Sequence, residues 1–135
     1  MMQRRMLSVT LFQHDRSLRQ RPHDRHRFDV LICYLPNHHS LSSSHLYIIP
    51  AGYLVDQGVV SDVNSGIETA TGRLYLAGGF SDSSHRGRRK KKSLLYQRYF
   101  VDCSQPLKAK AMVEGILQEC INDTAERANA LTPLS

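Results

Sequence analysis

The stretch that decides the fold runs from Phe28 to Leu54 and reads FDVLICYLPNHHSLSSSHLYIIPAGYL. It contains two compact apolar runs, 30–35 and 46–49, separated by ten residues rich in His and Ser. Each run is followed by proline, and short apolar runs with such stops are typical of β-strands. A connection of this length permits an antiparallel hairpin. Because the first run is nearly continuous, we expect it to be a central strand covered on both faces.

Three further short elements follow this hairpin. Residues 51–60 predict a short helix or turn before the break at Gly58. Its inward-facing residues are expected to be Leu54, Val55 and Val59. The segment RLYLA, Arg73–Ala77, predicts a third strand, and YFVDC at 99–103 is a fourth candidate.

The clearest helix begins after Ser104, where apolar residues recur at steps of three and four. The residues of this apolar face are Ala109, Met112, Val113, Ile116, Leu117, Cys120 and Ile121. The opposite surface is expected to carry Lys108, Lys110, Glu114 and Glu119. Such a pattern is typical of a helix that docks on its own core. Beyond Asp123 the pattern weakens, so the helix is expected to fray toward Ala130.

The length of 135 residues and a hydrophobic content of 41% suit one domain with a modest core. We therefore predict an α+β domain over 28–122, in which a small three- to four-stranded sheet is covered by the C-terminal amphipathic helix. Residues 1–27 are rich in Arg and poor in large apolar residues near Pro22, which predicts a disordered basic arm. Residues 123–135 are expected to form a frayed helix end and a tail.

Positive charge is the most conspicuous compositional feature. The chain has 18 Lys and Arg against 12 Asp and Glu, a formal net charge of +6. The run HRGRRKKK predicts an exposed basic loop over 81–93, because like charges at this density repel one another. The residues expected to contact a nucleic-acid phosphate backbone are Arg86, Arg88, Arg89, Lys90, Lys91 and Lys92 of this loop, with Arg25 and Arg27 of the arm. A nuclear-import address and a solvated loop without a partner remain open alternatives.

Cysteine usage and the first residues indicate the cellular compartment. Cys33, Cys103 and Cys120 are widely spaced and odd in number, which favours reduced thiols in an intracellular setting, nuclear or cytoplasmic. The start of the chain carries Arg4 and Arg5 among apolar residues with no early acid, so a mitochondrial presequence is a second reading. No apolar run approaches the length of a transmembrane helix.

Four segments carry a resemblance to a known family. FDVLICYLP, LYIIPAGYLVDQGVV, GRLYLAGG and YQRYFVD, within residues 28–102, resemble the later part of the PD-(D/E)XK restriction-endonuclease-like superfamily. The similar branches are the intron-associated homing endonucleases and the MepB-like proteins. The resemblance implies a partial restriction-endonuclease-like fold. That family places its metal-binding acids and catalytic lysine upstream of these elements, so the resemblance implies no catalytic role for Asp29.

The sequence departs from that family in its chemistry. Metal-dependent cleavage of this type needs an acidic pair with a lysine two residues after the second acid. None of the twelve acids has lysine at that offset. The remaining metal-like grouping, Cys33, His38, His39 and His45, fits none of the usual zinc spacings. We therefore predict no catalytic residue, metal site or cofactor.

These observations favour one function and leave two open. The first is a non-catalytic, nucleic-acid-binding remnant or fragment of a PD-(D/E)XK nuclease-like protein. The alternatives are a protein-interaction or structural module with no nucleic-acid role, and an active metal-dependent nuclease. The sequence leaves the oligomeric state undetermined.

Overall fold

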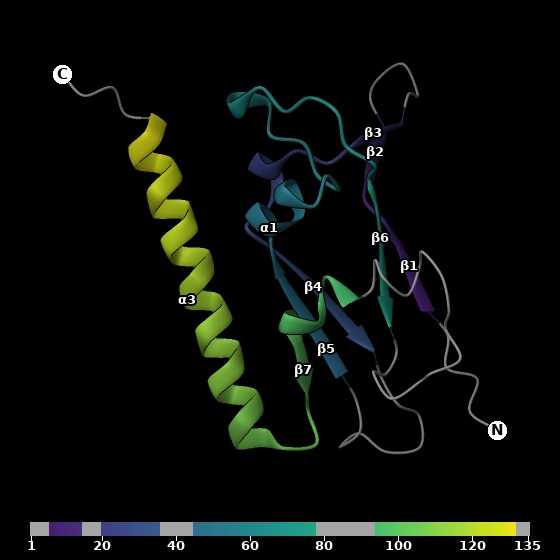
Figure 1. The fold of residues 1–135 in the computed structure, drawn as a ribbon, viewed down its shortest axis with the longest axis vertical. Coiled ribbons are helices and arrows are strands. Elements are labelled where there is room, and N and C mark those ends of the chain that lie inside the picture. The colour runs from purple at the N-terminus through teal and green to yellow at the C-terminus, as the bar shows by residue number, and fades with distance from the viewer. Residues whose placement is uncertain (1–5, 15–19, 36–44, 78–93, 132–135) are drawn as a thin grey trace.

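The computed structural model describes residues 6–14, 20–35, 45–77 and 94–131. Within these residues the fold is α+β, as predicted, with short antiparallel sheets and a long C-terminal helix. Figure 1 shows the helix α3 along one side, the strands β4, β5 and β7 in the middle, and β1 with β6 on the other side. The core therefore lies on both faces of the middle sheet.

The middle sheet has the strand order β4 (Val30–Leu35), β5 (His45–Pro50), β7 (Phe100–Asp102). The predicted hairpin is confirmed, since β4 pairs antiparallel with β5 from Val30 opposite Pro50 to Leu35 opposite His45. The fourth candidate strand is confirmed as β7, which pairs antiparallel with the other side of β5.

The predicted position of the first strand in this sheet is wrong. The central strand is β5, in which Tyr47 and Ile49 are fully buried, and β4 lies at an edge with the side chain of Ile32 58% exposed. The reason is that β5 has a strand on each side, while α3 lies mainly over β5 and β7. An apolar run of six residues therefore forms an edge strand here.

The predicted disorder of residues 1–27 is also wrong for the part of that segment that the structure describes. It contains β1 (Met6–Thr10), β2 (Phe12–His14), β3 (Gln20–Pro22) and the 3-10 helix η1 (Arg25–Arg27). β1 pairs antiparallel with β6 (Arg73–Ala77), so the predicted third strand exists but belongs to a separate sheet. Backbone pairing supplies the order that the polar composition of this segment does not predict.

The core is built from both sides of the middle sheet. The short helix α1 (Ala51–Asp56) is confirmed, and the expected inward residues after β5 are all buried. The largest fully buried hydrophobic side chains are Tyr47, Ile49, Leu54, Val60, Leu74, Leu76, Tyr99 and Val101. Val9 on β1 and Leu11, which closely follows β1, pack against this cluster.

The C-terminal helix α3 (Pro106–Leu131) is confirmed, with a narrower buried face than predicted. Ile116 and Cys120 are buried, whereas Leu117 is 40% and Ile121 is 61% exposed. Glu119, expected on the outer surface, points toward the domain and accepts a hydrogen bond from Tyr99. Among the described residues, no helix is both long and apolar enough to span a bilayer.

Candidate functional site

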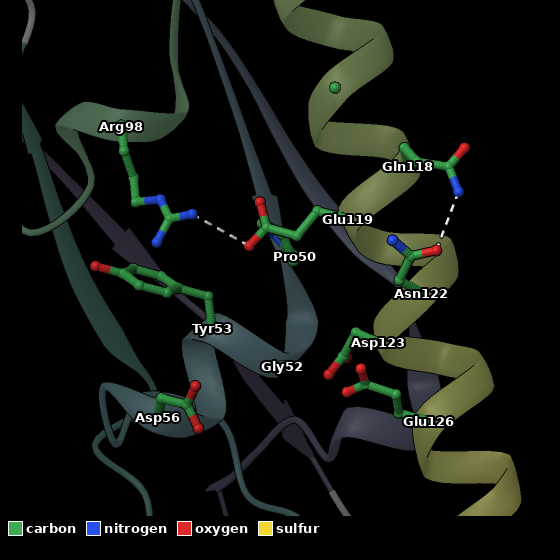
Figure 2. A pocket seen from close by; sticks show the side chains of 11 residues that line it. Pro50, Gly52, Tyr53, Asp56, Arg98, Gln118, Glu119, Asn122, Asp123 and Glu126 are labelled. Carbon is green, nitrogen blue, oxygen red and sulfur yellow. Dashed lines mark hydrogen bonds and ion pairs between the residues drawn. The ribbon is translucent and has the colours of Figure 1, made fainter.

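A pocket of about 540 Å³ lies between α1, α3 and the 3-10 helix η4 (Gln97–Tyr99). Figure 2 shows its side chains, with Arg98 directed toward Glu119 on α3 and the Tyr53 ring of α1 beside the Arg98 side chain. Its lining residues are Pro50, Gly52, Tyr53, Asp56, Arg98, Gly115, Gln118, Glu119, Asn122, Asp123 and Glu126. Four carboxylates and one guanidinium make this lining acidic.

Arg98 and Glu119 form the polar centre of the pocket. The Arg98 guanidinium carbon lies 4.9 Å from the ring centre of Tyr99 and 5.7 Å from that of Tyr53, within reach of a cation–π contact. Its Nη2 is 3.5 Å from Oε1 of Glu119, which also accepts a 2.7 Å hydrogen bond from the Tyr99 hydroxyl. These contacts join η4 to α3 and partly neutralise the one cation in the lining.

The tyrosines beside this pair remain protonated near neutral pH. Burial, followed by the hydrogen bond to Glu119, raises the pKa of Tyr99 well above its usual value. Burial likewise raises the pKa of Tyr96 to about 12. The Tyr53 ring packs edge-on against both, and its hydroxyl donates to the carbonyl of Leu95. The aromatic cluster therefore fixes the backbone that follows residue 93.

Arg25 has a structural partner. Its Nη2 lies 2.6 Å from Oδ2 of Asp123, and the Arg25 side chain is only 12% exposed. This ion pair joins η1 to α3 at the rim of the pocket. The structure thus engages Arg25 within the domain, whereas Arg27, the other predicted phosphate contact of the arm, is exposed beside a smaller pocket of about 260 Å³.

A second polar cluster joins η1 to the loop after α1. Asp24 accepts hydrogen bonds from the backbone N–H groups of His26 (3.1 Å) and Val63 (3.0 Å) and from the Ser61 hydroxyl (3.3 Å). Burial alone would raise the pKa of Asp24, but these hydrogen bonds and the nearby His26 ring outweigh it and hold the pKa below its usual 3.8. Nε2 of His26 also lies 3.8 Å from Oδ1 of the buried Asp62.

Asp24 and Asp62 both approach His26, yet their carboxylates hold the loop at 61–65 through hydrogen bonds. Within the described ranges, no three His, Cys, Asp or Glu side chains are arranged to hold a metal ion. Asp29 at the start of β4 is exposed, and its carbonyl accepts the Ala51 N–H at 2.9 Å. Of the four residues considered as a zinc grouping, Cys33 lies on β4 and His45 lies on β5. His38 and His39 lie outside the described residues.

The six predicted phosphate contacts at 86–92 lie outside the described residues, as does the whole predicted loop 81–93. Ten of the eighteen Lys and Arg, and two of the twelve Asp and Glu, fall outside the described ranges.

Comparisons with known proteins support the fold. No family model matches the chain, and no curated protein matches it in sequence. A crystal structure of MepB matches with a TM-score of 0.58 and 14% sequence identity, over 73% of this chain and 62% of that chain. The chain thus spans less than two thirds of that MepB chain. The two share a fold over the matched region, in agreement with the coarse resemblance at the level of sequence.

The sequence did not indicate the pocket. Glu119 and Asp123 lie on α3, while Tyr53, Arg25 and Arg98 come from three other elements. No spacing in the chain links them, since Arg25 and Asp123 are 98 residues apart. The available signal was the group Tyr53, Tyr96 and Tyr99, whose hydroxyls need partners once the rings are buried.

Proposed function

We propose that this protein is a non-catalytic nucleic-acid-binding protein with a MepB-like fold, which contacts phosphates through its basic segments. The observation that carries the proposal is the density of positive charge at 86–92, where six of seven residues are Lys or Arg. The whole chain carries a formal net charge of +6. We therefore expect phosphate binding to come mainly from Arg86 and 88–92.

The described part of the domain is a poor surface for phosphate. The pocket beside α3 is lined by four carboxylates, and its guanidinium, Arg98, faces Glu119. Arg25 is engaged by Asp123. Arg27 is the member of the predicted arm set that remains exposed. The six cations within seven positions at 86–92 are expected to contribute more to phosphate binding than Arg27 does. Each phosphate that a cation neutralises releases condensed counterions, so affinity grows with the number of such contacts.

The absence of catalysis is part of the proposal and is supported by the chemistry of the acids. No acid in the sequence is followed by lysine at the second position. Asp24 and Asp62 already accept hydrogen bonds that hold the backbone. A remnant of a nuclease-like fold would keep the scaffold and the affinity for phosphate while lacking these catalytic groups.

The test measures the affinity for a fluorescent DNA duplex as the salt concentration is raised. The double variant Arg88→Ser/Arg89→Ser should bind more weakly and lower the magnitude of the log–log salt slope by about 2, because each lost phosphate contact removes about 0.9. The matched control is Lys108→Ser/Lys110→Ser on α3, which removes the same net charge. Lys110 is exposed beside Glu114, so the control should bind like wild type.

The alternatives predict other results. Equal weakening by both double variants would assign binding to overall charge, and absence of binding at low salt would favour a protein-interaction module. Cleavage of the duplex with Mg²⁺ or Mn²⁺ by the purified protein, abolished by Asp24→Asn in a folded variant, would make it a metal-dependent nuclease.

A further inference from the structure

We propose that the smaller pocket, between Leu11, η1 and the start of β4, receives one unpaired base of a single-stranded nucleic acid, while Arg27 binds a neighbouring phosphate. This inference rests on the proposed function and narrows it, because phosphate contacts alone do not separate single strands from duplexes. It places the base in a site separate from the predicted basic loop at 81–93.

The pocket has a volume of about 260 Å³ and mostly apolar walls. Its lining residues are Leu11, His23, Arg27, Phe28, Val30 and Leu31. None of these six is acidic, whereas four carboxylates line the larger pocket beside α3. Sites that enclose a drug-sized ligand have volumes of about 300–1,000 Å³, so this smaller one suits a single flat ring system. Walls without acid also suit an anionic nucleotide.

Two aromatic rings and three aliphatic side chains form most of the walls. The rings of His23 and Phe28 have their centres 6.4 Å apart and their planes at 81°. Phe28 is half-buried, and it packs against the core together with Leu11, Val30 and Leu31. Unpaired bases stack on aromatic rings in single-stranded complexes. A base in a duplex is already stacked between its neighbours, so it would have to leave the helix to enter the pocket.

Arg27 supplies the positive charge at the rim. Its side chain is exposed, and within the described ranges it has no ion pair or hydrogen bond, whereas Arg25 is paired with Asp123. That ion pair joins η1 to α3, and the Arg27 N–H donates to the Asp24 carbonyl at 3.0 Å, so the backbone of η1 is held in place. A guanidinium binds a phosphate through two parallel N–H···O bonds. Because Arg27 and Phe28 both line the pocket, the phosphate of a base held there would lie within reach of the guanidinium.

The imidazole of His23 can contact the edge of the base. Its backbone is fixed on both sides, since the His23 N–H donates to the Leu11 carbonyl (3.0 Å) and the His23 carbonyl accepts from the Ser61 N–H (3.2 Å). A neutral imidazole has one donor and one acceptor nitrogen. The pocket therefore combines a stacking surface, one adaptable polar group and one cation, which suits a base without strict sequence preference.

One base and one phosphate provide only part of the affinity. A stacked base contributes about five- to 150-fold in affinity, as judged by alanine substitution. A single nucleotide should therefore bind weakly, and a strand long enough to reach the cations at 86–92 should bind far more tightly. Stacking releases no condensed counterions, so it does not share the steep salt dependence of phosphate contacts. Base and phosphate contacts can thus be measured separately.

Two fluorescent single-stranded probes of about twelve nucleotides, a length that single-strand-binding domains cover, make this measurement. One is oligothymidylate, and the other is the same sugar-phosphate strand without its bases. Wild type should bind oligothymidylate at least about fivefold more tightly than the abasic strand at every salt concentration, with parallel log–log salt slopes. This comparison requires no variant.

Phe28→Leu locates the base. Leucine keeps an apolar side chain against the core but removes the ring, so this variant should bind the two probes alike. The matched control is Phe100→Leu on β7, because Phe100 is also half-buried against the core but does not line this pocket. It should keep the wild-type preference. Arg27→Ser should lower the magnitude of the salt slope by about 0.7 for both probes, and Lys108→Ser on α3 should leave it unchanged.

Equal affinity of the wild type for the two probes would overturn the inference. If that equal binding still weakens steeply with salt and with Arg88→Ser/Arg89→Ser, the proposed function stands without the base pocket. A preference that survives in Phe28→Leu, or that is lost equally in Phe100→Leu, would place the base elsewhere and overturn the pocket, once thermal melts show both variants folded. Absence of binding to both probes and to duplex would overturn the proposed function and this inference together.

Discussion

The strands β4 and β5 are similar in sequence and different in environment. Both are six residues long, and both are dominated by apolar residues. Yet β5 has four consecutive buried residues, from Tyr47 to Pro50, whereas β4 has none. The difference arises from neighbours, because β5 is flanked by β4 and β7 and covered by α3, while the helix leaves β4 largely uncovered.

This comparison separates two uses of apolar residues. On β5 they stabilise the monomer by being removed from water, an effect of about 25 cal/mol per Å² of apolar surface. On β4 the side chains of one face are likewise removed from water, while Ile32 on the other face keeps more than half of its surface exposed. Apolar content thus predicts a strand, and burial alone decides whether the strand belongs to the core or to a surface.

The largest effect is expected at the centre of β5. Ile49 is fully buried, so Ile49→Ala should lower the free energy of unfolding by about 2–5 kcal/mol, through lost burial and the cavity that remains. Urea unfolding followed by circular dichroism measures this change. A loss below about 1 kcal/mol would mean that the core collapses around the site or that β5 is not central.

Helix α3 shows the same contrast between a buried and an exposed apolar residue within two turns. Ile116 is buried against the sheet, and Ile116→Ala should cost about 2–4 kcal/mol. Ile121 is the matched control on the exposed flank, and Ile121→Ala should change stability by less than about 1 kcal/mol. Equal losses at the two positions would contradict the orientation of α3.

Local patterns predicted the elements better than their arrangement. The hairpin and the helix follow from spacing within a few residues, and both are confirmed. β1 was missed because its partner β6 is more than sixty residues away in sequence, and propensity cannot report such pairing. The inward turn of Glu119 and Asp123 was missed for a related reason. Their hydrogen-bond partners, Tyr99 and Arg25, lie on other elements, so the amphipathic pattern placed Glu119 outside.

An intermediate effect is expected at Asp24, which precedes β4 and anchors the loop at 61–65. The Asp24 carboxylate accepts hydrogen bonds from three donors, and Asp24→Asn replaces one of its oxygens by an NH₂ group that cannot accept. The free energy of unfolding should therefore fall by about 1–3 kcal/mol. The pKa of Asp24 is lowered on folding, so its contribution is present above the usual 3.8 and is lost as the pH falls through the folded value. Wild type should therefore lose more stability than Asp24→Asn between pH 5 and pH 2. Parallel losses in the two proteins would assign the acid sensitivity to other groups.

A small effect is expected from Ile32→Ala on the exposed side of β4. Since 58% of Ile32 is already exposed, truncation should lower the free energy of unfolding by less than about 1 kcal/mol. A loss comparable to that of Ile49→Ala would show that the Ile32 side of β4 is covered in solution.

The smallest effect is expected at Asp29, the carboxylate that opens β4. Its backbone carbonyl binds the N–H of Ala51 and joins β4 to α1, a contact that Asp29→Asn preserves. The side chain is exposed, and the sequence supplies no lysine two residues after it. Asp29→Asn should therefore change stability by less than about 0.5 kcal/mol and leave duplex binding as in wild type. Asp24→Asn is the matched carboxylate control, since it neutralises one charge at the same end of β4 but breaks backbone contacts. If the wild-type protein cut DNA with Mg²⁺, and Asp29→Asn abolished cutting without altering the melting temperature, Asp29 would be catalytic and the start of β4 would belong to an active site.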